Sequence, residues 1–185
     1  MKVDLTHYNT GDYETGANTA KRILWYLVNA LVFDSWLFPW SSMKSALLKA
    51  FGAELGPGTV IKPRVNIKYP WNLSAGKNLW LGEGVWIDSL APVRLGSNVC
   101  ISQDAYLLTG NHNYTITTFP LIVKGITVED GAWIGARATI CPGVTIRDHT
   151  VITVASVVTK DTESHGIYQG NPAVLIKTRV LRSPD

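Results

Sequence analysis

Histidine is the side chain best suited to move protons near neutral pH, and this chain contains four. They are His7, His112, His149 and His165. Only His112 stands in a long polar loop, within the stretch Thr109-Gly110-Asn111-His112-Asn113-Tyr114. A single loop histidine can be a general base, but it can also be a solvated or structural side chain, so its position alone leaves the role open.

Metal chemistry has little support in the sequence. No two histidines have the close spacing of zinc ligands, and Cys100 and Cys141 are far apart without a metal-type spacing. We therefore expect no metal site. The chain also lacks a charged start followed by a cleavable apolar segment, and its cysteine usage is typical of a reducing cytoplasm.

The elements that must position His112 are indicated by a repeat of six residues. Six successive positions carry β-branched aliphatic residues: Val128, Ile134, Ile140, Ile146, Ile152 and Val158. The frame extends back through Leu107, Ile101 and Leu95, then Ile87 and Leu81, then Leu73, Ile67 and Ile61. Two residues before most frame positions stands another small or apolar residue, so both sets share one face of a short strand.

Two interruptions of the frame, from Leu73 to Leu81 and from Ile87 to Leu95, predict two extra residues at a corner. Turn formers such as Gly82-Glu83-Gly84 and Pro142-Gly143 separate the short strands. Such strands become buried only by stacking on their equivalents one coil above and below. The pattern predicts an all-β fold, a parallel β-helix of hexapeptide repeats over residues 56–165.

A third interruption between Leu107 and Val128 is too long for a corner and predicts an excursion loop over residues 108–125. Long loops on a rigid scaffold tend to carry function. Residues 166–185 are expected to form a C-terminal extension. Large aromatic residues at Trp80, Trp86, Tyr106 and Trp133 should point outward, where they could stack on sugars or bury a subunit interface.

Residues 1–55 are expected to form an N-terminal arm and a helical cap. The arm is polar, Ile23 to Trp40 is almost entirely apolar, and a second helix follows Ser41-Ser42, which could cap it. Pro39 and the polar residues in between argue against a membrane span. The helices could close the end of the β-helix, or residues 23–40 could contact a membrane surface peripherally.

Several motifs together resemble the hexapeptide-repeat acyltransferases. They are the Thr-Gly-x-His loop, Ala132-Trp133-Ile134-Gly135, Pro142-Gly143-Val144-Thr145-Ile146, Ser156-Val157-Val158-Thr159-Lys160-Asp161 and Gly170-Asn171-Pro172-Ala173. With Tyr69-Pro70-Trp71 and Val85-Trp86-Ile87-Asp88, the chain looks most like the colanic-acid type of exopolysaccharide O-acetyltransferase, followed by galactoside and maltose acetyltransferases. The resemblance implies a left-handed coil and a homotrimer with active sites between subunits.

The resemblance further implies acetyl transfer from acetyl-CoA to a saccharide hydroxyl, with no metal required. His112 would be the general base, acting without a covalent intermediate. Asp88 would orient the histidine or hold a sugar hydroxyl, although an ordinary solvated turn acid is the alternative. Asn111, Asn113 and Trp86 would contact the acceptor.

For acetyl-CoA the resemblance assigns residues along the last coils: Trp133, Ala136, Val154, Thr159, Lys160 and Lys177. The two lysines would lie near the phosphates, or they could simply be solvated. Two positions depart from the family pattern, because Val174 stands where an arginine is frequent and Val154 where a small residue is frequent. These departures put the geometry of coenzyme binding in question.

Other functions fit less well. A γ-type carbonic anhydrase needs three histidine ligands, and a non-enzymatic scaffold would show a regular outward ladder. Acceptors left open are a lipid-linked saccharide, a small free sugar and an amino group, and a carrier protein could donate the acyl group. The net charge of +3 without a basic run does not suggest nucleic acid. We expect a cytoplasmic protein, which could work at the inner face of the membrane.

Overall fold

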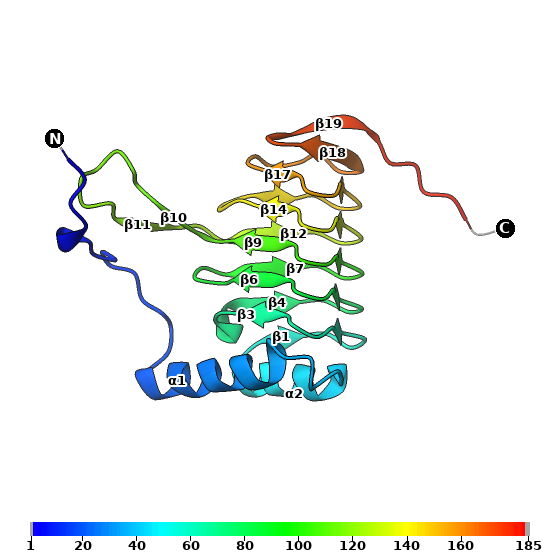
Figure 1. Ribbon diagram of the computed structural model, residues 1–185. Coiled ribbons are helices and arrows are strands. Elements are labelled where there is room, and N and C mark those ends of the chain that lie inside the picture. Colours follow the sequence, from blue (N-terminus) through cyan, green and yellow to red (C-terminus); the bar gives the residue numbers. More distant parts are fainter. Residues whose placement is uncertain (1, 184–185) are drawn as a thin grey trace.

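A computed structural model of the protein describes residues 2–183 and consists mainly of a parallel β-helix (Figure 1). Three parallel sheets form its faces, and the chain visits faces A, B and C in that order in each coil. Face A contains β1 (Glu54–Leu55), β4 (Leu73–Ala75), β7 (Val93–Leu95), β12 (Ile126–Val128) and β15 (Thr145–Ile146). Face B contains β2 (Val60–Ile61), β5 (Trp80–Leu81), β8 (Cys100–Ile101), β13 (Trp133–Ile134), β16 (Val151–Ile152) and the hairpin β18 (Gly166–Gly170) and β19 (Ala173–Thr178). Face C contains β3 (Asn66–Ile67), β6 (Trp86–Asp88), β9 (Tyr106–Leu108), β14 (Thr139–Ile140) and β17 (Val157–Val158).

The hexapeptide frame forms the core, as predicted. The frame residues predicted between Ile61 and Val158 each expose at most 4% of their surface, and so do most of the small or apolar residues two positions earlier. Neighbouring coils pair frame residue with frame residue, for example Ile134 with both Ile101 and Ile152. Burial of stacked aliphatic side chains is therefore what holds these two- and three-residue strands together. The aromatic residues Trp80, Trp86 and Trp133 point outward, also as predicted.

The register corrects one predicted interruption. Ala75 pairs with Leu55 and Leu95, so Ala75 is the frame residue of its strand. Leu73 pairs with Val93 and therefore occupies the position two residues before the frame. The additional residues therefore lie between Ile67 and Ala75, not between Leu73 and Leu81. As a result all three interruptions of the repeat occur at one corner of the β-helix, where face C turns into face A.

Two helices close the N-terminal end of the β-helix (Figure 1). They are α1 (Thr19–Val28), continued by a π-helical turn (Asn29–Phe33), and α2 (Ser41–Ala50). Their buried side chains Trp25, Phe33 and Leu48 join the core. Trp25 Nε1 donates to the Ile67 carbonyl (2.8 Å) and Lys44 Nζ donates to the Lys62 carbonyl (3.0 Å), which satisfies acceptors at the open edge of the first coil.

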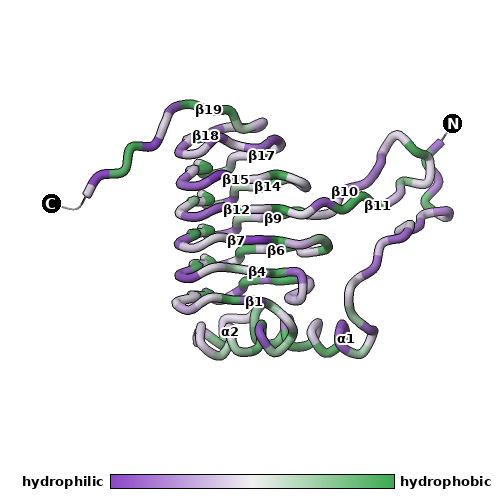
Figure 2. The backbone as a smooth tube through the Cα atoms, turned by 180° about the vertical axis from the view of Figure 1, so that it is seen from behind, coloured by the Kyte–Doolittle hydropathy of each residue, from purple (hydrophilic) through white to green (hydrophobic). Residues whose placement is uncertain are grey.

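The sequence suggested Ser41 as a cap of α2, but its side chain does not cap the helix. Its hydroxyl instead donates to the Ile61 carbonyl (3.3 Å) and accepts from the Ile61 amide (3.0 Å), so it fastens the helix to the first coil. Much of the helical end of the chain is hydrophobic in sequence, as the colouring of the backbone in Figure 2 shows. Its exposed large residues are Ile23, Leu24, Tyr26, Leu27, Leu31, Trp36, Leu37 and Trp40. Within residues 2–183, no helix combines the length and apolarity needed to cross a bilayer.

The residues between β9 and β12 leave the β-helix as an antiparallel hairpin, β10 (Gly110–His112) and β11 (Leu121–Val123). The N-terminal arm reaches this hairpin and lies beside it (Figures 1 and 2). The arm contains a 3-10 turn (Leu5–His7), and the amide of Asp4 donates to the Thr117 carbonyl over 2.9 Å. A further 3-10 turn (Pro70–Asn72) lies in the first corner insertion.

Candidate functional site

The three corner insertions stack on one another and bring the candidate residues together. The Ser89 hydroxyl donates to the Tyr69 carbonyl (2.9 Å) and accepts from the Tyr69 amide (3.0 Å), which joins the second insertion to the first. The fully buried Thr109 hydroxyl donates to the Asp88 carbonyl and accepts from the Ala91 amide, which joins the third to the second. Paired polar groups of this kind hold the corner rigid.

His112 ends β10 and lines a cavity of about 690 Å³ at this corner. Its Nδ1 lies 3.1 Å from the carbonyl oxygen of Phe119. Because a carbonyl can only accept, Nδ1 is the donor, and in the neutral imidazole Nε2 therefore keeps its lone pair. The Phe119 ring stacks on the imidazole, with ring centroids 4.5 Å apart and an angle of 12° between the planes. The centroid of the Tyr8 ring lies 5.8 Å from that of the imidazole. The ring is therefore fixed in the tautomer that a general base requires.

Asp88 lines the same cavity, and it is not the solvated turn acid of the alternative interpretation. Only 5% of the residue is exposed. Lys68 Nζ lies 3.2 Å from its Oδ1, which compensates the charge. The contact lacks hydrogen-bond geometry, so within residues 2–183 Oδ1 has no hydrogen-bond donor. Since Phe119 rather than Asp88 accepts from Nδ1 of His112, the geometry favours Asp88 as an acceptor for a ligand hydroxyl.

Glycine at position 110 allows the hairpin to leave this corner. A Cβ there would stand 2.7 Å from Leu90 Cδ1 and 3.5 Å from Asp88 Oδ2. Any other residue would therefore push Leu90 away and narrow the space beside the carboxylate.

The structure separates the three predicted acceptor contacts. Asn111 lines the cavity of His112, and its Oδ1 accepts from the His112 amide at 2.8 Å. The Oδ1 of Asn113 accepts from the amide (3.1 Å) and hydroxyl (2.6 Å) of Thr115, so this carbonyl oxygen stabilises the tip of the hairpin. Trp86 lies outside the cavity, where it stacks on Tyr106 with centroids 4.7 Å apart.

The N-terminal arm, for which the sequence predicts no functional role, supplies one wall of the cavity. Tyr8, Thr10, Tyr13 and Thr15 face it, together with Arg22 from α1 and Lys68 and Tyr69 from the first insertion. The hydroxyl of Tyr13 donates to the Leu90 carbonyl at 3.1 Å. Burial, with the nearby Tyr69 and Asp88, raises the pKa of Tyr13 to about 12, so it remains a neutral hydroxyl.

Three of the candidate coenzyme residues line a separate cavity, the coenzyme cavity, of about 330 Å³ at the corner between faces B and C. They are Trp133, Ala136 and Val154. Trp133 Nε1 donates to the Ser102 hydroxyl at 2.9 Å, and Val154 is exposed at the rim. Thr159, Lys160 and Lys177 lie outside this cavity and are exposed. This cavity shares no lining residue with that of His112, so one chain places the two candidate sites at different corners.

A group of possible metal ligands occupies the remaining corner, between faces A and B. The ligand atoms of Asp148, His149 and His165 lie within 4.8 Å of one another. The spacing of these residues in the sequence did not indicate the group. His149 and His165 are 16 positions apart, and the stacking of the corners brings them together. Arg179 Nη1 donates to the His149 carbonyl over 3.0 Å, which places a cation beside the group.

Comparison with known proteins places the chain among acetyltransferases. No family model matches it. The protein named "Putative colanic acid biosynthesis acetyltransferase WcaF" of Escherichia coli strain K12 is 35% identical over 181 residues, 96% of this chain and 97% of that protein. The galactoside O-acetyltransferase of the same strain is 30% identical over 142 residues, 72% and 68% of the two chains.

Solved structures agree with this result. A galactoside acetyltransferase in complex with coenzyme A has a TM-score of 0.76 and 26% identity, with 86% of this chain and 80% of that chain covered. The hexapeptide-repeat acetyltransferase VCA0836 of Vibrio cholerae O1 biovar eltor, complexed with acetyl coenzyme A, has a TM-score of 0.80 and 20% identity, with 94% and 96% covered. The likeness confirms the predicted fold, a left-handed parallel β-helix of hexapeptide repeats.

Proposed function

Because the chain belongs to the hexapeptide-repeat acetyltransferases, the family that includes WcaF, we propose that it transfers acetyl from acetyl-CoA to a saccharide hydroxyl in surface polysaccharide synthesis. The observation that carries this proposal is the tautomer of His112. Its Nδ1 is committed to the Phe119 carbonyl, so Nε2 is free to take a proton inside the cavity. Neutral imidazole is the form that a general base must have before reaction.

The reaction proceeds by direct attack. The acceptor hydroxyl lies between Nε2 of His112 and the thioester, and its oxygen forms a bond to the carbonyl carbon as Nε2 removes its proton. The carbon–sulfur bond then breaks, and the proton on Nε2 passes to the departing sulfur of coenzyme A. The carboxylate of Asp88, which lines this cavity, accepts from another hydroxyl of the sugar and fixes its orientation.

Acetyl-CoA binds along the corner between faces B and C, beside Trp133, Ala136 and Val154. Backbone and small side chains on this corner accommodate the pantetheine arm, while the exposed Lys160 and Lys177 approach the phosphates. The exposed Val154 and Val174 replace the residues typical of the family, so the lysines carry more of the phosphate recognition here. Thr159 lies next to Lys160 on the same turn.

The protein acts as a homotrimer in this proposal. His112 and three of the candidate coenzyme residues, Trp133, Ala136 and Val154, lie at different corners of one chain and line separate cavities. Two copies placed side by side can bring the corner with His112 of one chain to the corner with Ala136 of the next. A closed ring of three such contacts completes every site.

The helical end is proposed to rest on the cytoplasmic face of a membrane. Eight large apolar side chains between residues 23 and 40 are exposed, including Trp36, Leu37 and Trp40. Tryptophan and tyrosine are favoured at the level of lipid head groups, and Lys21 and Arg22 lie next to the apolar segment. Docking in this manner would bring the cavity of His112 near a lipid-linked acceptor.

The proposal is tested by measuring acetyl transfer from acetyl-CoA to a panel of saccharides, with each product identified by mass spectrometry. We expect an O-acetylated saccharide that forms at a rate above acetyl-CoA hydrolysis alone. Amino sugars in the same panel separate O- from N-acetylation. Transfer to amines only, or hydrolysis without any transfer, would contradict the proposal.

A further inference from the structure

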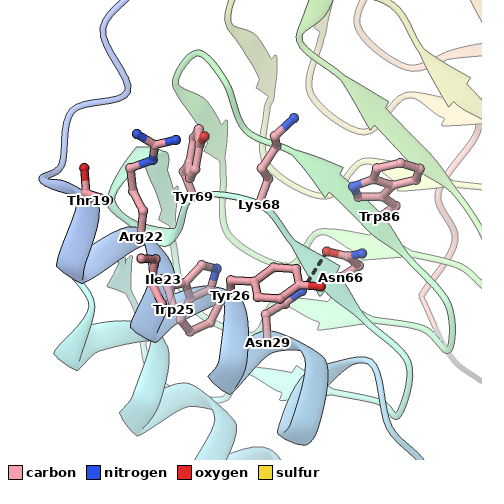
Figure 3. Close-up of a pocket in the computed structure, with 10 residues that line it drawn as sticks. All are labelled: Thr19, Arg22, Ile23, Trp25, Tyr26, Asn29, Asn66, Lys68, Tyr69 and Trp86. Atoms are coloured by element: carbon pink, nitrogen blue, oxygen red, sulfur yellow. Dashed lines mark hydrogen bonds between the residues drawn. The ribbon is translucent and has the colours of Figure 1, made fainter.

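A second cavity of about 410 Å³ adjoins that of His112, between α1 and the outer side of face C (Figure 3). Three residues line both cavities: Arg22, Lys68 and Tyr69. In Figure 3 their side chains extend to the same side, above Trp25 and Tyr26. A ligand that occupies both spaces must therefore pass these three side chains.

The second cavity is suited to an apolar or planar group. Trp25, Tyr26 and Trp86 contribute rings, and Ile23 contributes an aliphatic side chain. The polar groups of its floor are largely paired, because Asn29 Nδ2 donates to Asn66 Oδ1 (2.9 Å) and Trp25 Nε1 donates to a backbone carbonyl. The cavity thus offers apolar surface with few free hydrogen-bonding groups.

The passage between the cavities is cationic. Lys68 is compensated by Asp88, 3.2 Å away, whereas Arg22 makes no ion pair with any residue of the described part of the chain. Among the residues that the structure describes, no acidic one lines the cavity between α1 and face C. A guanidinium and an ammonium group at one passage present several donors to an anion, and both groups are common binders of phosphate.

Building on the proposed function, we propose that Arg22 and Lys68 form a phosphate subsite and that the acceptor is a glycosyl phosphate or diphosphate. Its sugar lies in the cavity of His112, its phosphate lies between the two cations, and the group beyond the phosphate occupies the aromatic cavity. A prenyl chain and a nucleoside share this chemistry, since either is linked to the sugar through phosphate. The acceptor is therefore an activated saccharide rather than a free sugar.

The experiment compares two pairs of probes by isothermal titration calorimetry: geranyl diphosphate with geraniol, and uridine diphosphate with uridine. We expect at least one diphosphate to bind roughly tenfold or more tightly than its unphosphorylated counterpart, because charged hydrogen bonds add this much affinity. The diphosphate that binds identifies the source as prenyl or nucleotide. Arg22→Gln should weaken that probe by roughly 10- to 100-fold.

Lys21→Gln is the matched control, since the Lys21 ammonium lies over the Trp71 ring at 4.9 Å and lines neither cavity. It should leave probe affinity unchanged. His112→Ala should also retain binding, so the subsite is tested independently of acetyl transfer. Equal binding of phosphorylated and unphosphorylated probes, or equal loss in Arg22→Gln and Lys21→Gln, would overturn the proposal.

Discussion

Nδ1 of His112 donates to the carbonyl oxygen of Phe119 across 3.1 Å, and the Phe119 ring lies stacked on the imidazole. One residue therefore fixes both the tautomer and the plane of the proposed base. Phe119 has a φ of +51°, a conformation that non-glycine residues adopt only when their surroundings hold it.

Removal of the stacked ring should misplace the base without affecting coenzyme binding. Phe119→Ala is expected to lower kcat about tenfold or more, since small displacements of a catalytic group cost this much. The KM for acetyl-CoA should not change. Phe119→Tyr keeps the ring and should retain most of the parental kcat. Steady-state kinetics with both substrates varied would refute the positioning role if Phe119→Ala kept the parental kcat.

The charge of Asp88 should be detectable in alkaline titrations. The pKa of Tyr106 is raised from its ordinary value of 10.0 to about 12, mainly by burial and also by the nearby charge of Asp88. The charge of Asp88 also helps to raise the pKa of Tyr13. Between pH 10 and about pH 12 the hydroxyl of Tyr106 therefore loses its proton in the unfolded chain but keeps it in the folded chain. Stability therefore falls as pH rises from about 10 to 12.

In Asp88→Asn one cause of the raised pKa is absent, so both tyrosines should ionise at lower pH and the alkaline loss of stability should be smaller. Absorbance titration of tyrosinate and urea unfolding at several pH values measure the two effects. Tyr106→Phe is the control that removes one of the titrating groups. An unchanged titration in Asp88→Asn would mean that the carboxylate does not influence the pKa of either tyrosine.

The stacked core predicts a large effect at Ile140, which is fully buried between Leu107 and Val158. Ile140→Asp would bury an uncompensated carboxylate and should cost several kcal/mol of unfolding free energy. Thr139→Asp places the same charge on the neighbouring outward position and should change it by less than about 1 kcal/mol. Thermal unfolding of both variants compares the faces, and equal melting temperatures would be inconsistent with the assigned core.

The membrane proposal predicts sedimentation of the protein with anionic vesicles at low salt, and less at high salt because Lys21 and Arg22 contribute electrostatically. Trp36→Ser combined with Leu37→Ser should abolish most of this binding, because both side chains are more than 60% exposed. Trp80→Ser on face B is the control. Failure to recover the intact protein with vesicles at low salt would rule out docking.

The repeat made the fold predictable, because six-residue spacing of aliphatic residues has few other structural solutions. It did not locate every corner. Leu73 and Leu81 are both aliphatic and suited the frame, and only the pairing of Ala75 with Leu55 and Leu95 shows where the extra residues lie. Placing all interruptions at one corner would have grouped Lys68, Asp88 and Thr109 before the structure was known.

The remaining parts of the candidate site could not be predicted from local patterns. His112 and Asp88 stand near recognisable motifs, but Tyr8, Tyr13 and Arg22 come from an arm and a helix far away in the chain. Their positions depend on how the arm packs against the hairpin, through contacts such as that of Asp4 with Thr117. No spacing rule encodes a contact between segments more than 100 residues apart.

The most direct test of the account is the turnover of His112→Ala with acetyl-CoA and the best saccharide acceptor. We expect kcat to fall by roughly two to four orders of magnitude while folding and coenzyme affinity remain nearly parental. Cys100→Ala and Cys141→Ala serve as controls, because burial raises the pKa of both thiols and neither should form an acyl-enzyme. Acetyl transfer by His112→Ala at close to the parental rate would contradict the proposed mechanism.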